Sequence, residues 1–226
     1  MQKKQQVKRI FDSISHKYDL LNHLLSAGID VYWRKRAIKL TKFEKDAKLL
    51  DIACGTGDFA ISAKKAGIKE IVGADLSANM LNYFHKKAEW SIGNAVQSVA
   101  ESLPFKSDSF SNITVAFGVR NFYDIPMAFQ KFREILIKNG KVTILEFRLP
   151  TNKLVRGFYL FYFNRILPFV GRIISSDKEA YTYLPESVDE FDKKVDLIKL
   201  LKEAGFSEVE RHSLTFGIVQ IVIGKK

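Results

Sequence analysis

Apolar side chains recur at helical spacing at the start of the chain. Between Lys3 and Leu25 they fall three or four positions apart, at Val7, Ile10, Phe11, Ile14, Tyr18 and Leu21, which predicts an amphipathic helix. A second, basic helix is predicted over Val31–Leu40. Residues 1–41 are therefore expected to form a helical cap ahead of the main fold.

Further along, short apolar runs alternate with amphipathic segments. The runs predict strands at Ala47–Ala53, Glu70–Asp75, Ala95–Val99, Asn112–Phe117 and Lys141–Phe147. The segments between them predict helices at Asp58–Ala66, Ala78–Ala88 and Ile125–Ile137, and we expect Asn139-Gly140 to close the last of these. Such alternation predicts right-handed βαβ units, and hence a parallel sheet with helices on both faces.

The end of the chain departs from this alternation. One helix is predicted over Phe191–Ala204 with Gly205 at its C-terminus, and strands follow at Glu208–Ser213 and Gly217–Ile223. The short turn between these strands forces them antiparallel, because a parallel neighbour needs a crossover of about a dozen residues or more. The predicted fold class is α/β: a Rossmann-like, mostly parallel seven-stranded sheet with an antiparallel C-terminal strand and helices on both faces.

Residues 150–187 fit neither pattern. Leu154–Val170 is rich in aromatic residues and carries few charges, and its aromatics run almost all round a helix. Two interpretations stay open: a buried packing helix, or a functional surface that is either an apolar cap over a hydrophobic ligand or a membrane-contacting face. We treat residues 1–226 as a single domain in which residues 150–187 form an apolar lid insertion.

Charge and composition narrow the choice of partners. The formal net charge is +11 and the pI is near 9.6, which attracts nucleic acid or an anionic membrane surface, although simple solubility explains it equally well. The lysines are scattered without a nucleic-acid-binding signature, so no nucleic-acid partner is expected. The single cysteine and the lack of a secretory or membrane-spanning segment predict a cytoplasmic location.

A glycine-containing segment, GTGDFA at residues 55–60, follows the first predicted strand and opens a helix. It fits the pattern G-x-G-x-x-[GA], in which glycines allow a sharp turn and a close approach to a ligand. Nicotinamide and flavin proteins use the same pattern. Asp51 lies four residues before Gly55 and would repel a pyrophosphate, so a cationic ligand such as S-adenosylmethionine, with its ammonium and sulfonium groups, fits better.

The next two strand ends supply further candidate ligands. Asp75 ends the second strand, where a carboxylate can accept both hydroxyls of a ribose, in NAD as well as in adenosylmethionine. Ser77 is the predicted N-cap of the next helix. Ala100–Phe105 follows the third strand at the carboxyl edge of the sheet, where it could flank an adenine, while Phe105 fits a core position equally well.

Ten segments, in order along nearly the whole chain, carry a family resemblance. They are Phe11–Asp19 with Asn22, Leu25–Gly28, Trp33-Arg34, Asp51–Asp58, Asp75–Ser77 with Met80-Leu81, Ala100–Phe105, Phe117–Asn121, Leu145–Phe147 with Pro150, Tyr183–Ser187 and Leu214–Val219. Through them the chain resembles the ubiquinone/menaquinone biosynthesis C-methyltransferases. Lys17–Asp19, Phe117–Asn121 and Leu214–Val219 are the segments most specific to that family.

This resemblance implies a class I methyltransferase fold, S-adenosylmethionine as cofactor, and a polyprenyl quinol as the methyl acceptor: demethylmenaquinol, a ubiquinol-precursor benzoquinol, or both. It implies cofactor contact through Thr56, Asp75 and residues 99, 100 and 116. Val99 stands where the family usually has Asp or Asn, so a side-chain hydrogen bond to the adenine is lost, and Ala116 replaces a common Ser. The complete set of predicted cofactor-binding residues is Asp51, Gly55, Thr56, Gly57, Asp75, Leu76, Val99, Ala100, Glu101 and Ala116.

Methylation of a quinol carbon requires a phenolic proton to leave, so that the ortho carbon can attack the methyl group. The candidate catalytic residues are Arg120, Asn121 and Tyr18, with His16 as a further helper. Arginine is a poor base, since its pKa exceeds about 12, so Arg120 is expected to stabilise the phenolate or orient a water. A salt bridge is the alternative role for Arg120, and N-terminal packing for Tyr18. No metal is expected, because the four histidines show no ligand spacing.

The polyprenyl tail needs an apolar shelter, for which Phe158–Phe169 and the first helices are candidates. The positive charge would then serve peripheral docking on anionic lipid at the inner face of the cytoplasmic membrane, and a homodimer is left open. Three alternatives stay in view: another small-molecule or lipid methyltransferase, an NAD(P)-dependent oxidoreductase, and a non-catalytic lipid- or RNA-binding module. Asp51 and the antiparallel ending argue against the second, and the intact loop with Asp75 argues against the third.

Overall fold

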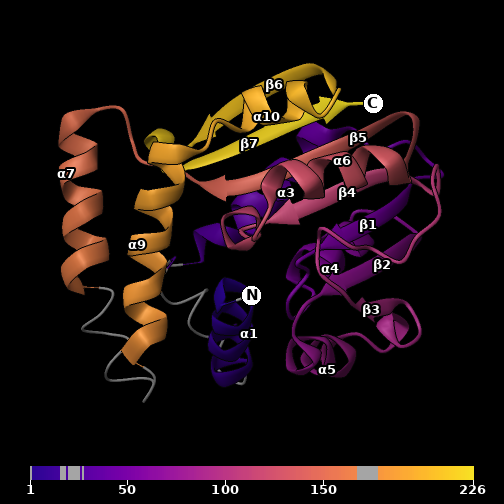
Figure 1. Ribbon diagram of the computed structural model, residues 1–226, viewed down its shortest axis with the longest axis horizontal. Coiled ribbons are helices and arrows are strands. Elements are labelled where there is room, and N and C mark those ends of the chain that lie inside the picture. The colour runs from indigo at the N-terminus through magenta and orange to yellow at the C-terminus, as the bar shows by residue number, and fades with distance from the viewer. Residues whose placement is uncertain (1, 16–18, 20–25, 27, 167–177) are drawn as a thin grey trace.

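A computed structural model of the chain describes residues 2–15, 19, 26, 28–166 and 178–226. Its centre is a seven-stranded sheet of order β3-β2-β1-β4-β5-β7-β6 (Figure 1). The strands are β1 (Lys48–Ile52), β2 (Glu70–Asp75), β3 (Ala95–Gln97), β4 (Phe110–Ala116), β5 (Leu136–Phe147), β6 (Ser207–Leu214) and β7 (Val219–Lys225). β7 runs antiparallel to both of its neighbours, and the remaining pairs are parallel. The predicted fold class is confirmed.

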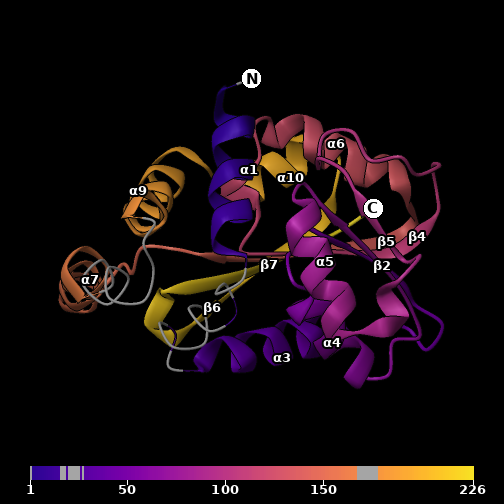
Figure 2. The same ribbon diagram turned by 90° about the horizontal axis from the view of Figure 1, so that it is seen from below.

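Helices cover both faces of the sheet. The helices of the described residues are α1 (Gln2–Ile14), α3 (Ile29–Thr41), α4 (Asp58–Lys65), α5 (Ala78–Lys87), α6 (Ile125–Ile135), α7 (Lys153–Phe161), α9 (Lys178–Lys194) and α10 (Leu197–Glu203). The single turns are η1 (Glu89–Ser91), η2 (Val119–Asn121), η3 (Tyr162–Ile166) and η4 (Thr215–Gly217). Figure 2 shows α6 and α10 on one face and α3 and α4 on the other.

Alternating side chains of the central strands build a separate core on each face. Leu50 packs with Phe132 of α6 and Leu201 of α10, whereas its neighbour Leu49 packs with Ala37 of α3 and other residues of the opposite cluster. Successive side chains of a strand point to opposite faces, so a parallel strand covered on both sides is apolar throughout. The continuous apolar runs in the sequence therefore mark the central strands.

The prediction that Asn139-Gly140 closes α6 is wrong. β5 already begins at Leu136, and its register with β4 shifts near its start, so Asn139 and Gly140 lie inside the strand. Asn139 has a left-handed φ of 65°. A Cβ on Gly140 would lie 2.9 Å from the Ile137 oxygen and 3.0 Å from the Ser111 oxygen. The pair therefore forms an irregularity in a strand, which its composition does not distinguish from a helix end.

The single helix predicted over Phe191–Ala204 is also wrong, because the chain forms two helices there. Asp196 lies between α9 and α10 in an extended conformation, and its carboxylate accepts a hydrogen bond from Ile198 N at 3.1 Å. Such an N-cap satisfies a backbone N–H that would otherwise lack a partner and starts a new helix. Gly205, with a φ of 89°, follows the end of α10 as predicted.

The aromatic stretch is buried on one side and exposed on another. Tyr159 and Phe163 are buried in a small cluster with Leu149 and Val188, which joins α7 to α9. Leu154, Phe158 and Phe161 are exposed. Part of the stretch, residues 167–170, lies outside the described residues. Within those described, no helix is long and apolar enough to cross a membrane.

Candidate functional site

The loop between β1 and α4 is a tight turn that depends on its glycines. Ala53, Gly55 and Gly57 all have left-handed backbone, with φ of 51°, 56° and 85°. A Cβ on Gly57 would lie 2.0 Å from the ring of Phe84, so no other residue fits without rearrangement. Gly55 N donates to Asp75 Oδ2 at 2.8 Å, which ties the loop to the end of β2.

Asp75 has a structural role as well as a position suited to binding. Its two carboxylate oxygens accept hydrogen bonds from Gly55 N and Ser77 N, both at 2.8 Å. Burial raises the pKa of Asp75 to about 6, against the lowering effect of these N–H groups. Ser77 caps α5 as predicted, accepting from Met80 N at 3.1 Å. Asp75 therefore fixes the turn while its carboxylate borders a cavity.

Asp51 is a buried carboxylate with one satisfied and one unsatisfied oxygen. It is 1% exposed, and Oδ1 accepts from the Thr114 hydroxyl at 2.7 Å. Among the described residues, Oδ2 has no hydrogen-bond partner. Burial raises the pKa of Asp51 to about 7, and the Thr114 hydroxyl, the Ala60 backbone N–H and the positive charge of Arg34 offset only part of that effect. An oxygen left without a donor here favours a cationic ligand.

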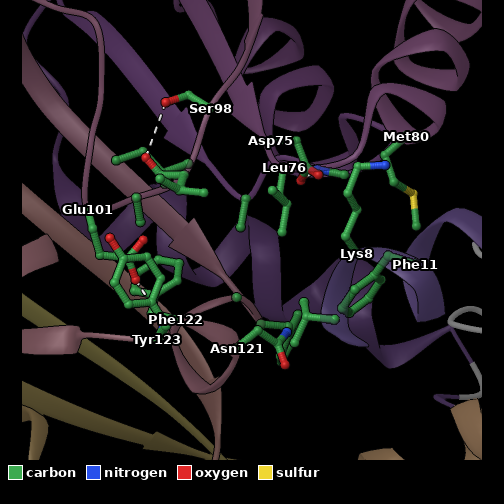
Figure 3. Close-up of a pocket in the computed structure, with 18 of the residues that line it drawn as sticks. Lys8, Phe11, Asp75, Leu76, Met80, Ser98, Glu101, Asn121, Phe122 and Tyr123 are labelled. Carbon is green, nitrogen blue, oxygen red and sulfur yellow. Dashed lines mark hydrogen bonds between the residues drawn. The ribbon is translucent and has the colours of Figure 1, made fainter. Parts of the chain in front are cut away.

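Two adjoining cavities lie at the carboxyl edge of the sheet. The larger, mostly apolar cavity is shown in Figure 3 and is lined by Val7, Lys8, Phe11, Ile52, Ala53, Gly55, Asp75, Leu76, Met80, Ser98, Val99, Ala100, Glu101, Ala116, Phe117, Gly118, Asn121, Phe122 and Tyr123. The smaller cavity is lined by Arg34, Asp51, Ala53, Cys54, Gly55, Thr56, Asp58, Phe59, Ala116 and Phe117. Ala53, Gly55, Ala116 and Phe117 border both, so an acidic recess opens beside an apolar one.

The predicted cofactor-binding residues gather around these two cavities. Asp75, Leu76, Val99, Ala100 and Glu101 line the larger one, Asp51 and Thr56 the smaller one, and Gly55 and Ala116 both. Gly57 borders neither and acts through the turn.

Glu101 and Phe105, both in the segment after β3, have different roles. Glu101 is buried, and its Oε1 accepts from Tyr123 N at 2.9 Å and from Asp124 N at 3.2 Å, so its carboxylate orders the start of α6. Phe105 packs against Phe110 with ring centroids 5.1 Å apart and borders neither cavity, which is the core position that the sequence left open.

Arg120 makes a buried ion pair, which is the alternative role considered for it. Its Nη1 donates to Glu146 Oε1 at 2.8 Å and to the Phe117 carbonyl, and its backbone N–H donates to Glu146 Oε2 at 3.3 Å. Glu146 is fully buried on β5, and the guanidinium lies 5.6 Å from the Phe147 ring centroid. This pair holds η2 against the end of β5.

Asn121, next to Arg120, borders the larger cavity and is joined to α9. The Tyr183 hydroxyl donates to Asn121 Oδ1 at 2.8 Å, and burial raises the pKa of that hydroxyl. Tyr183 is a site residue that sequence reasoning did not single out, although it belongs to a segment that carries the family resemblance. Tyr18 and His16 lie outside the described residues.

An ionic network fastens the N-terminal segment to the glycine loop. The Thr56 hydroxyl donates to Asp19, and the Lys87 ammonium binds Asp19 at 2.8 Å and also Asp58. Arg34 lies 3.3 Å from the other oxygen of Asp58. None of these links joins residues that are close in sequence, so charge spacing could not reveal them.

α1 lies over the larger cavity and is anchored beside Asp75. Asp12 of α1 accepts from the Ser77 hydroxyl and binds Lys8 at 2.6 Å. Val7, Lys8 and Phe11 contribute to the cavity wall (Figure 3). The described residues contain no group of three or more His, Cys, Asp or Glu side chains placed to hold a metal ion.

Comparison with known proteins identifies relatives across the full length. Residues 1–226 match the ubiE/COQ5 methyltransferase family. A demethylmenaquinone methyltransferase of Chlorobaculum parvum is 39% identical over 214 residues, covering 93% of this chain and 88% of that protein. A ubiquinone/menaquinone biosynthesis C-methyltransferase UbiE of Geotalea daltonii is 38% identical over 231 residues, covering 100% and 98%.

Similar solved structures agree on the fold. A SAM-dependent methyltransferase of Thermotoga maritima has a TM-score of 0.65 at 19% identity and covers 96% of this chain and 99% of that one. At this identity the likeness concerns the fold, and the family follows from the full-length match and the relatives above. The resemblance first seen in short segments is confirmed: the chain belongs to the ubiE/COQ5 methyltransferase family and has the class I methyltransferase fold.

Proposed function

We propose that this chain transfers a methyl group from S-adenosylmethionine to a ring carbon of a polyprenyl quinol, either demethylmenaquinol, a ubiquinol-precursor benzoquinol, or both. The observation that carries the proposal is the pair of cavities joined at Gly55, one acidic through Asp51 and one apolar. A cofactor with a cationic end and an adenosine end matches that pair. The names of the full-length relatives support the quinol as acceptor.

The chain's own residues fit adenosylmethionine. Asp51 Oδ2, buried without a hydrogen bond, would take the ammonium group. Asp75 would accept from the ribose hydroxyls while it keeps its two N–H donors, since a carboxylate has about four acceptor sites. Val99 and Ala116 offer apolar and backbone contact to the adenosine. When bound, the cofactor supplies an electrophilic methyl group on its sulfonium.

The acceptor would lie near η2, where Asn121 borders the larger cavity. Because Tyr183 donates to Asn121 Oδ1, the amide nitrogen of Asn121 is oriented to donate a hydrogen bond to a quinol oxygen. A hydrogen bond donated to the phenolate would favour transfer of the phenolic proton to water, which makes the ortho carbon nucleophilic. That carbon would form its bond to the methyl group as the methyl–sulfur bond breaks, and loss of the hydrogen on the same carbon to water as a proton would restore the aromatic quinol. Tyr183 would act by positioning Asn121.

Arg120 would contribute as a fixed positive charge one residue away. It is not a base, since the pKa of arginine exceeds about 12, and Glu146 neutralises much of its charge. Its second role is to hold η2 in place through the Phe117 carbonyl. We also propose Tyr18 as a participant, from the family resemblance alone.

The polyprenyl tail would leave the cavity toward the aromatic side of the molecule. Phe117 borders both cavities and packs on Phe147 with ring centroids 4.6 Å apart, and Phe147 packs on Phe163 at 6.0 Å. These rings form a continuous apolar path from the site toward the segment of residues 150–187. An acceptor of this kind resides in a membrane, so we propose that the chain works at an anionic membrane surface.

Labelled methyl transfer tests the proposal. Purified protein and methyl-labelled adenosylmethionine are incubated separately with reduced demethylmenaquinone and with a reduced benzoquinone precursor, and label is expected in at least one acceptor. Asp51→Ala is expected to abolish both reactions and cofactor binding, while the exposed-site control Asp46→Ala keeps them. Label in neither acceptor contradicts the quinol assignment. Calorimetry that detects no binding of adenosylmethionine or adenosylhomocysteine contradicts the cofactor assignment as well.

A further inference from the structure

α7 carries an apolar stripe that the described chain leaves open. Leu154, Phe158 and Phe161 are 77%, 77% and 60% exposed, and their spacing of four and three residues places them on one side of the helix. The opposite side is buried through Tyr159 and Phe163. α7 stands at the outer end of the molecule, beyond α9 (Figure 1). Three large apolar side chains in one stripe exceed the isolated exposed residues normal for a monomer surface.

A further exposed aromatic lies in a turn that adjoins the segment leading into this helix. Phe216, in the turn between β6 and β7, is 83% exposed and has a left-handed φ of 55°. Left-handed backbone is unfavourable for a residue with a side chain. A Cβ on Gly217 would lie 3.7 Å from Pro150 Cα, so the turn adjoins the segment that leads into α7. The turn therefore holds a large ring in solvent beside that segment.

The charges on the segment that carries the stripe are all positive. Between Phe147 and Ser176 the sequence has basic residues and no Asp or Glu. Lys153 at the start of α7 and Arg165 in η3 are both exposed, at the two ends of the stripe. An apolar stripe bounded by basic residues is typical of a helix that lies in the interface of an anionic bilayer.

Charge also distinguishes between two possible partners of the stripe, a lipid bilayer and a second copy of the chain. In a two-fold symmetric dimer through this surface, the same patch of each copy would face itself. Lys153 and Arg165 of one copy would then approach basic residues of the other, without an acidic partner on the same segment. Anionic lipid headgroups accept these cations while the acyl region accepts the stripe.

We propose that the exposed stripe of α7, made of Leu154, Phe158 and Phe161 and bounded by Lys153 and Arg165, inserts into the surface of an anionic lipid bilayer, with Phe216 as a second contact. This inference deepens the proposed function, on which it rests for the reason to bind lipid. α7 follows β5, whose carboxyl end carries Phe147 of the aromatic path to the site. Docking through this stripe would place that path next to the bilayer.

Vesicle binding of the full-length protein tests the inference. Vesicles of phosphatidylglycerol and phosphatidylcholine are compared with vesicles of phosphatidylcholine alone, and binding is expected to the first and to be at least about tenfold weaker for the second. The triple variant L154S/F158S/F161S is expected to lose at least about tenfold in partitioning, since burying one such side chain contributes about tenfold or more. The matched control is I92S/M127S/I137S, which removes three exposed apolar side chains elsewhere and is expected to bind like the unmodified protein.

Three further measurements separate the outcomes. Circular dichroism and adenosylhomocysteine binding verify that each variant is folded, so that a loss of partitioning reports on the stripe. Equal partitioning of both triple variants overturns the inference. Light scattering without lipid that shows a dimer abolished only by the α7 variant, together with no vesicle binding, assigns the stripe to self-association and also overturns it.

The docking inference and the proposed function fail separately. Methylation of a water-dispersed short-chain quinol without any vesicle binding overturns docking and leaves the methyl transfer standing. Vesicle binding through the stripe without methylation of any quinol supports docking and contradicts the acceptor assignment. If both hold, the α7 variant keeps its activity on the short-chain quinol and loses it on a long-chain quinol embedded in anionic vesicles.

Discussion

At the scale of single residues, Asp51 faces opposing demands from folding and from binding. Its carboxylate lies in the interior, where an ionised group is costly, yet a cationic ligand needs it ionised. Burial raises the pKa of Asp51 to about 7. Burial therefore favours the protonated side chain, and in the binding mode proposed above a cationic ligand and a proton would compete for it.

Replacing this carboxyl should stabilise the protein that lacks cofactor. The pKa of Asp51 is raised from 3.8 to about 7, so its contribution to stability is fully present below pH 3.8 and is lost as the pH rises through 7. Asp51→Asn removes this loss and can keep the hydrogen bond from Thr114. We expect the free energy of unfolding at pH 8 to rise by about 2–4 kcal/mol, measured by denaturant titration. Asp46→Asn, at an exposed carboxyl, should leave it unchanged, and equal stability of all three proteins would contradict this account.

The raised pKa of Asp51 also predicts how cofactor affinity depends on pH. Because the ligand needs the ionised carboxylate, affinity should be constant well above pH 7 and weaken about tenfold per pH unit below it. Asp75, with its pKa raised to about 6, would steepen the loss at lower pH. Calorimetric titration with adenosylhomocysteine between pH 5.5 and 8.5 measures this. A flat profile would show that Asp51 does not take the ammonium.

At the scale of elements, the sequence predicts the strands of the sheet better than the irregularities within the elements. β2 lies at the predicted bounds because its apolar middle, with Ile71 and Ala74 buried, is bounded by Glu70 and Asp75, a pattern that is visible in the sequence. The helix end predicted at Asn139-Gly140 and the single helix predicted over Phe191–Ala204 are wrong because the outcome depends on strand register in the first case and on one side-chain hydrogen bond in the second. Asp51 and Asp75 could be found from their places at strand ends, whereas Tyr183 and Lys87 reach the site from helices distant in sequence.

The break between α9 and α10 gives a direct test of the N-cap. Asp196→Ala removes the hydrogen bond to Ile198 N and should lower the free energy of unfolding by about 1 kcal/mol. Asp196 also binds Arg211 at 3.1 Å, so Asp196→Asn, which keeps a capping oxygen and removes the charge, serves as control. We expect urea titration to show most of the loss for Ala and little for Asn. Equal losses would assign the effect to the ion pair instead.

Lys87 of α5 should control how firmly the N-terminal segment closes the site. Lys87→Met removes the cation that links Asp19 to Asp58 and leaves two carboxylates near each other. We expect adenosylhomocysteine to dissociate several-fold faster, measured by stopped-flow displacement. Lys86→Met is the matched control, because Lys86 lies over the Tyr83 ring and makes none of these contacts. If both variants release the ligand at the unmodified rate, the network does not retain it.

At the scale of the whole molecule, segments far apart in the chain close around one edge of the sheet. The strand ends provide the floor of the cavities, α1 lies over the larger one, and α9 contacts its wall where Tyr183 donates to Asn121. The carboxyl ends of parallel strands meet at one edge, so chemically unrelated loops come together there. Periodicity along the chain can predict that edge, but it cannot predict which distant helix covers it.

Ligand binding should therefore stabilise α1 and the loop after β1 more than α10. We expect adenosylhomocysteine at about one hundred times its dissociation constant to add about 2.7 kcal/mol to the free energy of unfolding. Hydrogen exchange should slow at backbone amides of α1 and of the loop after β1, and change little in α10, which packs away from the cavities. Equal slowing in α1 and α10 would argue that α1 does not close over the ligand.

The position of β7 has a consequence for how the protein is made. β7 lies between β5 and β6, so β5 has no partner on that side, and β6 has no partner at all, until β7 has left the ribosome. During synthesis β5 is therefore an open edge for the whole time that residues 148–218 are being added. An unpaired strand edge can pair with another chain and aggregate. Nascent chains halted before β7 should consequently depend on chaperones far more than the finished protein does.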